Sequence, residues 1–310
     1  MERRRLIDAI DDWLECYKSD SVKPLTFDRL IIARNLMSRY AIAVVPVCDI
    51  CCDDIQRYLK RLSQEGYSMS TIRKQFNLIT AYWKHAMARG LIENPVYLGV
   101  RLPAESSLVK SKTEIETYTH FEQERLMIHL MMLEKEQYGV IVLMLEEGLR
   151  VGEALALRWE DVLWSKRALS VKGTLVRLSR TAGVTFVQNS PKSKSSKRTI
   201  PLSEKAHDVL ERLAEKKGTE GFVFARPDDA LLPYSYSSVE FHIKKLCKDL
   251  VISYKGMHAF RHTFATNCYE RGCDVKILSK LLGHSDVAIT YNVYIHLYGD
   301  ELENMRSIIG

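Results

Sequence analysis

Apolar residues recur at helical spacing through the first hundred positions, and this repeat restricts that part of the chain to a bundle of helices. The spacing predicts helices over residues 5–17, 26–37, 49–66 and 70–90. The last three helices are expected to begin at residues whose side-chain oxygens can cap free backbone N–H groups, namely Thr26, Asp49 and Ser70. A helical domain over residues 1–100 follows from this pattern.

The periodicity weakens after the fourth predicted helix, where polar residues predict a linker over residues 101–117. A chain of 310 residues has room for a second domain, which we place at 118–310. Its pattern predicts helices over 120–135, 136–147, 151–158, 203–217, 235–250, 258–271 and 274–282. Three short alternating runs, 168–172, 184–189 and 198–202, predict one small antiparallel sheet. The expected fold class is therefore mainly α with a small antiparallel β-sheet (α+β).

Positive charge is concentrated in parts of the chain. The net charge is +6, and residues 165–203 hold nine Lys or Arg and no acidic residue. Such a span is typical of a solvated loop or of a surface that contacts phosphates. The same two interpretations apply to the fourth predicted helix and to the linker, whose candidate DNA contacts are Arg73, Lys74, Lys84, Arg89, Lys110 and Lys112.

The cysteines and the N-terminus indicate a cytoplasmic protein with free thiols. The seven cysteines are an odd number, the N-terminus lacks an apolar signal core, and no apolar run is long enough to span a bilayer. Cys48, Cys51 and Cys52 cluster, but no second Cys or His pair follows at zinc spacing. We therefore expect no metal site and no membrane partner.

Three segments of the second half carry residues suited to chemistry on a phosphate. Arg150 lies in GLRVGEALALRWEDV, and its guanidinium can hold phosphate oxygens in a fixed fork. His258 and Arg261 lie three residues apart in HAFRHTFATNCYERG, on one helix face. The third segment, LLGHSDVAITYNVYIH, holds His284, Tyr291 and Tyr294. Each residue taken alone is more often an ordinary surface or core residue than part of a site.

In this order the segments resemble the tyrosine recombinase family, whose pattern is GLRxxE, then HxLRHTFAT, then LGHxxxxxT, then a tyrosine. Phe260 stands where leucine is usual. The third segment is most similar to integrases of conjugative transposons and phages, in which the nucleophile lies ten residues after the histidine. This spacing implies Tyr294 as the nucleophile, with Tyr291 as the alternative. The resemblance also implies a helical core-binding domain followed by a catalytic domain.

The resemblance implies roles for further residues. The segment NSPKSKSSKRTIPLS is similar to the family's KTxxSxRxIPL element, which makes Lys192 the general acid, with Lys194 as the alternative. Lys194 and Lys197 are also expected to contact DNA. Glu153 matches the acidic member of the first motif and would orient Arg150 or His258. His258 would accept the tyrosine proton, and Arg150, Arg261 and His284 would stabilise the transition state. The reaction would need no cofactor, metal or ATP.

The implied partners are double-stranded DNA, further copies in a homotetramer on DNA, and an excisionase or a host DNA-bending protein. The C-terminal tail carries an apolar stripe at Leu302, Met305, Ile308 and Ile309, which would pack within the chain or dock on a neighbouring copy. The family's extra N-terminal arm-binding domain is expected to be absent or supplied elsewhere. The implied function is integration and excision of a mobile element in the bacterial nucleoid. The alternatives are a Xer-like resolver of chromosome or plasmid dimers, a type IB topoisomerase and an inactive DNA-binding relative.

Overall fold

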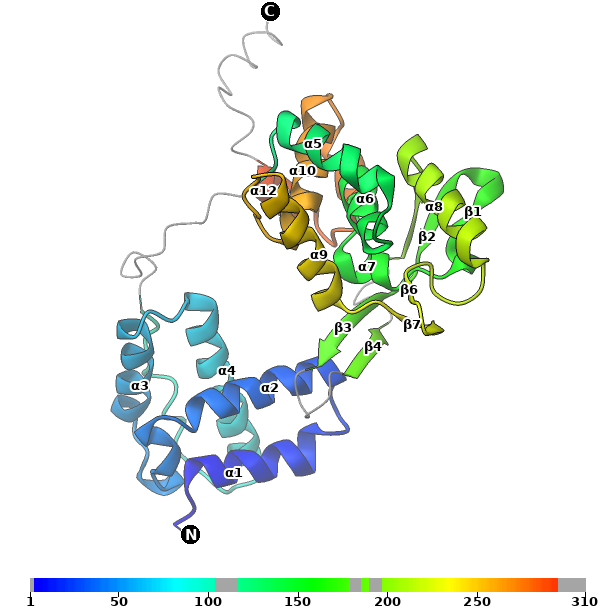
Figure 1. Ribbon diagram of the computed structural model, residues 1–310. Helices are drawn as coiled ribbons and strands as arrows, with labels where there is room; N and C mark the ends of the chain where they lie inside the picture. Colours follow the sequence, from blue (N-terminus) through cyan, green and yellow to red (C-terminus); the bar gives the residue numbers. More distant parts are fainter. Residues whose placement is uncertain (1–2, 104–115, 179–184, 190–196, 295–310) are drawn as a thin grey trace, which may run out of the picture. The chain divides into compact units, whose positions relative to one another are not determined.

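The computed structural model describes residues 3–103, 116–178, 185–189 and 197–294 (Figure 1). The chain divides into two compact units. The first contains Met1–Thr113 and Arg177–Phe186, and the second contains Glu114–Val176 and Val187–Gly310. Each unit has its own hydrophobic core. Within the described ranges, no helix is both long and apolar enough to cross a bilayer.

The first unit is helical, as predicted. It contains α1 (Leu6–Trp13), which continues as a π-helical turn, α2 (Pro24–Met37), α3 (Cys52–Gln64) and α4 (Met69–Ala88) (Figure 1). The apolar stripes that predicted the helices form the core. Its fully buried members include Leu6, Ile10, Ile55, Leu59, Ile72, Ile79 and Trp83.

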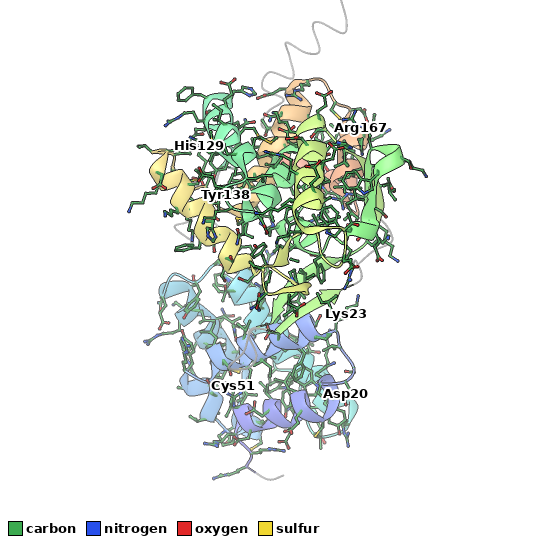
Figure 2. The ribbon with its side chains drawn as sticks, turned by 45° about the vertical axis from the view of Figure 1, so that its right-hand side comes forward. Asp20, Lys23, Cys51, His129, Tyr138 and Arg167 are labelled. Carbon is green, nitrogen blue, oxygen red and sulfur yellow. The ribbon has the colours of Figure 1, made fainter. Side chains whose placement is uncertain are left out.

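The predicted N-caps of these helices are wrong by two or three residues, because other groups satisfy the first N–H groups. Helix α2 begins after Lys23, since Pro24 needs no partner for its nitrogen. Helix α3 begins after Cys51, whose backbone N–H donates to Asp54 Oδ2 at 2.9 Å. Helix α4 begins after Ser68, which accepts from the backbone of Thr71. Lys23 and Cys51 are labelled in Figure 2.

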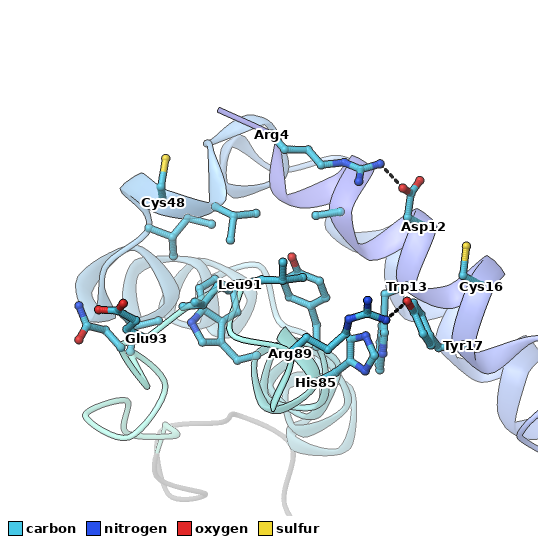
Figure 3. A pocket seen from close by; sticks show the side chains of 18 residues that line it. Arg4, Asp12, Trp13, Cys16, Tyr17, Cys48, His85, Arg89, Leu91 and Glu93 are labelled. Atoms are coloured by element: carbon cyan, nitrogen blue, oxygen red, sulfur yellow. Dashed lines mark hydrogen bonds and ion pairs between the residues drawn. The ribbon is translucent and has the colours of Figure 1, made fainter. Parts of the chain in front are cut away.

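The first unit also contains a pocket of about 690 Å³ lined by residues of α1, α4 and the segment after α4 (Figure 3). Arg4 forms an ion pair with Asp12 at one edge. Arg89 donates to the Tyr17 hydroxyl, and its guanidinium lies 5.1 Å from the centre of that ring. Arg89 therefore packs against an aromatic side chain of its own unit.

The helices of the second unit surround α6 (Gln137–Glu147), whose residues Val140–Met144 are at most 1% exposed. The sequence of α6 is apolar on every side, which is typical of a central helix. Its neighbours include α5 (His120–Met132), α8 (Glu204–Lys217), α9 (Tyr236–Asp249) and α10 (Met257–Glu270). Three further helices are α7 (Val151–Leu155), α11 (Val275–Leu282) and α12 (Val287–Tyr294). The predicted 151–158 helix thus ends earlier, at Leu155.

The strands confirm the predicted fold class and correct their expected arrangement. Strands β1 (Val162–Leu163), β2 (Ala168–Val171) and β5 (Arg198–Pro201) form one antiparallel sheet in the order β1-β2-β5. The predicted strand at 184–189 is not part of it. This segment is β4 (Thr185–Asn189), which pairs with the preceding and unpredicted β3 (Thr174–Leu178). The remaining pair is β6 (Ala225–Arg226) with β7 (Asp229–Pro233).

Candidate active site

A buried carboxylate gathers three arginines in the second unit. Glu153, on α7, is 5% exposed. Its Oε1 lies 2.8 Å from Nη1 of Arg150, and its Oε2 lies 3.0 Å from Nη2 of Arg198 and 3.7 Å from Nη1 of Arg261. A buried charge is stable only when it is paired, so this carboxylate fixes the positions of the guanidinium groups around it.

Gly148, Arg150 and Glu153 of the first motif each have a structural explanation. Gly148 ends α6 with a φ of +63°, a backbone conformation that glycine adopts at little cost. Arg150 is the N-cap of α7, and its backbone N–H donates to Oε2 of Glu153 at 2.9 Å. The motif therefore starts a new helix and places the Arg150 side chain, 35% exposed, beside the buried carboxylate.

Arg261 is held by main-chain carbonyls at the ends of two helices. From α10, its Nη1 donates to the Gly148 carbonyl at 2.8 Å, and its Nη2 donates to the Leu282 carbonyl at 2.7 Å. The same Nη2 lies 3.0 Å from Nε2 of His284. The Arg261 side chain is 6% exposed, so the guanidinium is fixed before any substrate arrives.

The two predicted catalytic histidines are both held in the neutral form. Partial burial lowers the pKa of His258, and the charges of Arg261 and Arg150 lower it further. Burial lowers the pKa of His284 to about 4, again with contributions from the nearby arginines. At neutral pH, a neutral imidazole can accept a proton, which suits His258 to the role of general base. His258 lies on the exposed side of α10.

The structure brings together four predicted site residues, Arg150, Glu153, Arg261 and His284, and His258 lies on the same helix as Arg261. Glu153 was predicted to orient Arg150 or His258. Its described partners are arginines, including Arg150. Helix α12 ends at Tyr294, but the Tyr294 side chain lies outside the described residues, as do Lys192 and Lys194.

The predicted DNA contacts lie in different surroundings. Arg73, Lys74 and Lys84 are exposed on α4, and Lys197 is exposed directly before β5. Arg89 is exposed too, but it follows the end of α4 and packs on Tyr17. Lys110 and Lys112 lie outside the described residues.

Arg198 is a further member of the cluster around Glu153 and was not among the predicted site residues. Its side chain is 7% exposed, forms two hydrogen bonds with Glu153, and donates from Nε to the Leu281 carbonyl at 2.6 Å. It therefore links β5, α7 and the end of α11. The arginine of the SxRxIPL element was the available signal, but we assigned Arg198 only to a strand.

Replacing Gly148 by alanine should destabilise the second unit by about 2–5 kcal/mol, which a thermal or urea melt would measure. The added Cβ would clash with Phe264 Cδ1, and the alanine would have to adopt a positive φ. The matched control is Gly272→Ala, which has a φ of +79° and no atom within 4 Å of the added carbon. If the two variants unfold at the same temperature, the clash with Phe264 adds nothing to the loss of stability.

The profile of the phage integrase family matches residues 116–301, more than half of the chain. The chain belongs to the phage integrase family. It is a tyrosine-type site-specific DNA recombinase, as its motifs predicted. Within the described residues, no group of His, Cys, Asp or Glu is placed to hold a metal ion.

Individual relatives come from several kinds of genetic element. The chain is 28% identical to a "Tyrosine recombinase XerC-like" protein of Caldanaerobacter subterraneus, over 96% of this chain and 80% of that protein. It is 24% identical to the transposase from transposon Tn916 of Enterococcus faecalis, over 84% and 67% of the two chains. Among solved structures, the Tn1549 transposon integrase has a TM-score of 0.80 at 20% identity, over 99% and 100% of the chains. This likeness shows the fold.

Proposed function

We propose that this recombinase cuts and rejoins double-stranded DNA at the ends of a mobile element, through a 3′-phosphotyrosine intermediate on Tyr294. One observation carries the proposal. Three arginines and one carboxylate form a cluster with a net positive charge, and this cluster contacts His284, which precedes the helix that ends at Tyr294. Such a cluster fits a scissile phosphate, because the transition state places more charge on the non-bridging oxygens.

Each step of the proposed reaction is assigned to a residue of the chain. The Tyr294 oxygen forms a bond to phosphorus and gives its proton to His258. The bond between phosphorus and the 5′ oxygen breaks, and Lys192 protonates the departing oxygen. Arg150 and Arg261 hold the non-bridging oxygens with charge-assisted hydrogen bonds. The 5′ hydroxyl of a partner strand reverses the step, so the energy of the broken bond is conserved in the phosphotyrosine.

The names of related proteins support the DNA substrate. The Tn1549 integrase was solved in complex with transposon right end DNA, and a lambda integrase dimer was solved bound to a core site. A lambda integrase tetramer was solved bound to a Holliday junction. We extend these properties to this chain, as a homotetramer in the bacterial nucleoid, with an excisionase or a DNA-bending protein as accessory partners.

The experiment that tests the function is capture of the covalent adduct on a nicked suicide duplex. The duplexes would carry the two ends of the resident mobile element or, for comparison, a chromosome-dimer resolution site, because the XerC-like relative supports a resolver as the second candidate. An adduct on the element ends, found on a denaturing gel and located by sequencing the attached oligonucleotide, is the expected result. An adduct found only on the chromosome-dimer resolution site would favour the resolver. Absence of an adduct on every duplex would contradict the proposed recombinase function.

Replacing Lys192 by alanine should slow cleavage by about 10²–10⁴-fold, the usual contribution of a general acid. A substrate with a 5′-bridging phosphorothiolate should restore the rate, because a thiolate leaves without a proton. The measurement is single-turnover adduct formation on the two substrates, with Lys194→Ala as the matched control. If only Lys194→Ala is slow and rescued, the acid role belongs to Lys194.

A further inference from the structure

The ring of His284 is held from both sides. On one side, Arg261 Nη2 lies 3.0 Å from Nε2. On the other side, the Thr290 hydroxyl oxygen lies 2.7 Å from Nδ1. Thr290 is 1% exposed and lies on α12, the helix that ends at Tyr294. Thr290 therefore connects the helix of the proposed nucleophile to the arginine cluster.

The chemistry of the two partners assigns the ring proton. A guanidinium has only donors, so Nε2 of His284 must be the unprotonated acceptor of the Arg261 hydrogen bond. A neutral imidazole carries one proton, which must then lie on Nδ1 and point at the Thr290 oxygen. Burial lowers the pKa of His284 to about 4, so the ring is neutral at pH 7.

This tautomer cannot donate to the scissile phosphate and so cannot stabilise the transition state, the role that the family resemblance implies for His284. A hydrogen bond from His284 to a phosphate oxygen needs the proton on Nε2, where the ring now accepts from Arg261. The ring must therefore exchange tautomers when a phosphate oxygen replaces Nε2 as the acceptor of the Arg261 proton. Nδ1 then loses its proton and becomes an acceptor. A threonine hydroxyl can serve either state, because it both donates and accepts.

We propose that Thr290 is a positioning residue for His284, whose hydroxyl accepts from Nδ1–H in the arrangement described here and donates to Nδ1 when Nε2–H bonds to the scissile phosphate. This inference rests on the proposed function, because it needs a phosphate at the cluster. In the exchange, Nδ1 releases one proton to water and Nε2 takes up one proton from water, so the total number of protons on the ring is unchanged. Thr290 keeps the ring in place and permits both tautomers.

The test compares Thr290→Val, which keeps the shape and loses the hydroxyl, with Thr290→Ser, which keeps the hydroxyl and loses a methyl group. We expect adduct formation to fall at least about tenfold in Thr290→Val and to stay within about threefold of wild type in Thr290→Ser. A purely structural role for Thr290 predicts the opposite order, because the serine variant leaves a cavity in the core. Thermal melts of the full chain would show that both variants are folded. Ile289→Val, at an exposed position of the same helix, should cleave at the wild-type rate.

A second measurement does not depend on catalysis. Nitrogen-15 NMR of labelled histidine, assigned with a His284→Gln variant, should show a protonated Nδ1 and an unprotonated Nε2 for His284 in the wild-type enzyme. A protonated Nε2 in the enzyme without DNA would overturn the inference, as would equal cleavage by Thr290→Val and wild type. Loss of cleavage in Thr290→Ser equal to that in Thr290→Val would also overturn it. Failure of the wild-type enzyme to form any adduct would instead contradict the proposed function.

Discussion

Tyr294→Phe should bind its DNA and form no covalent adduct, a loss of at least about a thousandfold. Phenylalanine keeps the aromatic ring at the end of α12 but removes the oxygen that attacks phosphorus. Binding should persist because it depends on the basic residues that contact phosphates. A denaturing gel on the nicked suicide duplex measures the adduct, and a mobility shift on the same duplex measures binding.

The matched control is Tyr291→Phe, three residues earlier on the same helix. This variant should form adduct at a rate close to that of wild type, because the spacing from His284 selects Tyr294. Adduct in Tyr294→Phe together with its loss in Tyr291→Phe would transfer the nucleophile to Tyr291. If both single variants form the adduct, neither tyrosine alone is the required nucleophile.

Glu153→Ala should cost about 3–5 kcal/mol of folding stability, because it leaves buried guanidinium groups without their shared carboxylate. Arg198 and Arg261 have side chains that are 7% and 6% exposed, so water cannot replace the lost partner. Urea unfolding at pH 7 measures the difference. Glu146→Ala is the control, because its ion pair with the half-exposed Lys205 should contribute less than about 1 kcal/mol.

The same carboxylate makes stability depend on pH. Burial raises the pKa of Glu153, but the Arg198 hydrogen bonds and the charges of Arg198, Arg150 and Arg261 lower it below the ordinary value of 4.5. A group whose pKa is lower in the folded state stabilises the fold above its ordinary pKa and loses this contribution as the pH falls through the lowered value. The difference in stability between wild type and Glu153→Gln should therefore shrink below pH 4.5. An unchanged difference on acidification would contradict the assignment.

The sequence predicted those features that depend on local pattern. Apolar periodicity located the helices of both units. The choice of Tyr294 rests on the spacing from His284 that the family resemblance implies, and it stays a prediction. The predicted N-caps of α2 and α3 were wrong. Lys23 can precede a helix that starts with Pro24, and Cys51 can precede one that has Asp54 in its first turn. Alternation alone could not tell that β4 pairs with β3, because pairing depends on partners and turns as well as on pattern.

The contacts of Arg198 and Thr290 could not be predicted from the sequence, although the family patterns SxRxIPL and LGHxxxxxT include both positions. Arg198 lies 45 residues from Glu153 along the chain and reaches it only in the folded unit. The contact of Thr290 with His284 spans six residues and depends on the turn between α11 and α12. The motifs mark the two positions but do not tell which groups either side chain contacts.

The carbonyl groups that hold Arg261 terminate two helices, since Gly148 follows α6 and Leu282 is the last residue of α11. The carboxyl end of a helix carries a partial negative charge, which would repel an incoming phosphate. The guanidinium cancels this repulsion at both ends. A lysine at this position would keep the formal charge, but one ammonium cannot reproduce the flat, two-armed bridge. Arg261 is therefore needed to allow an anion to bind where the two helix ends meet. This function is separate from any role in the reaction.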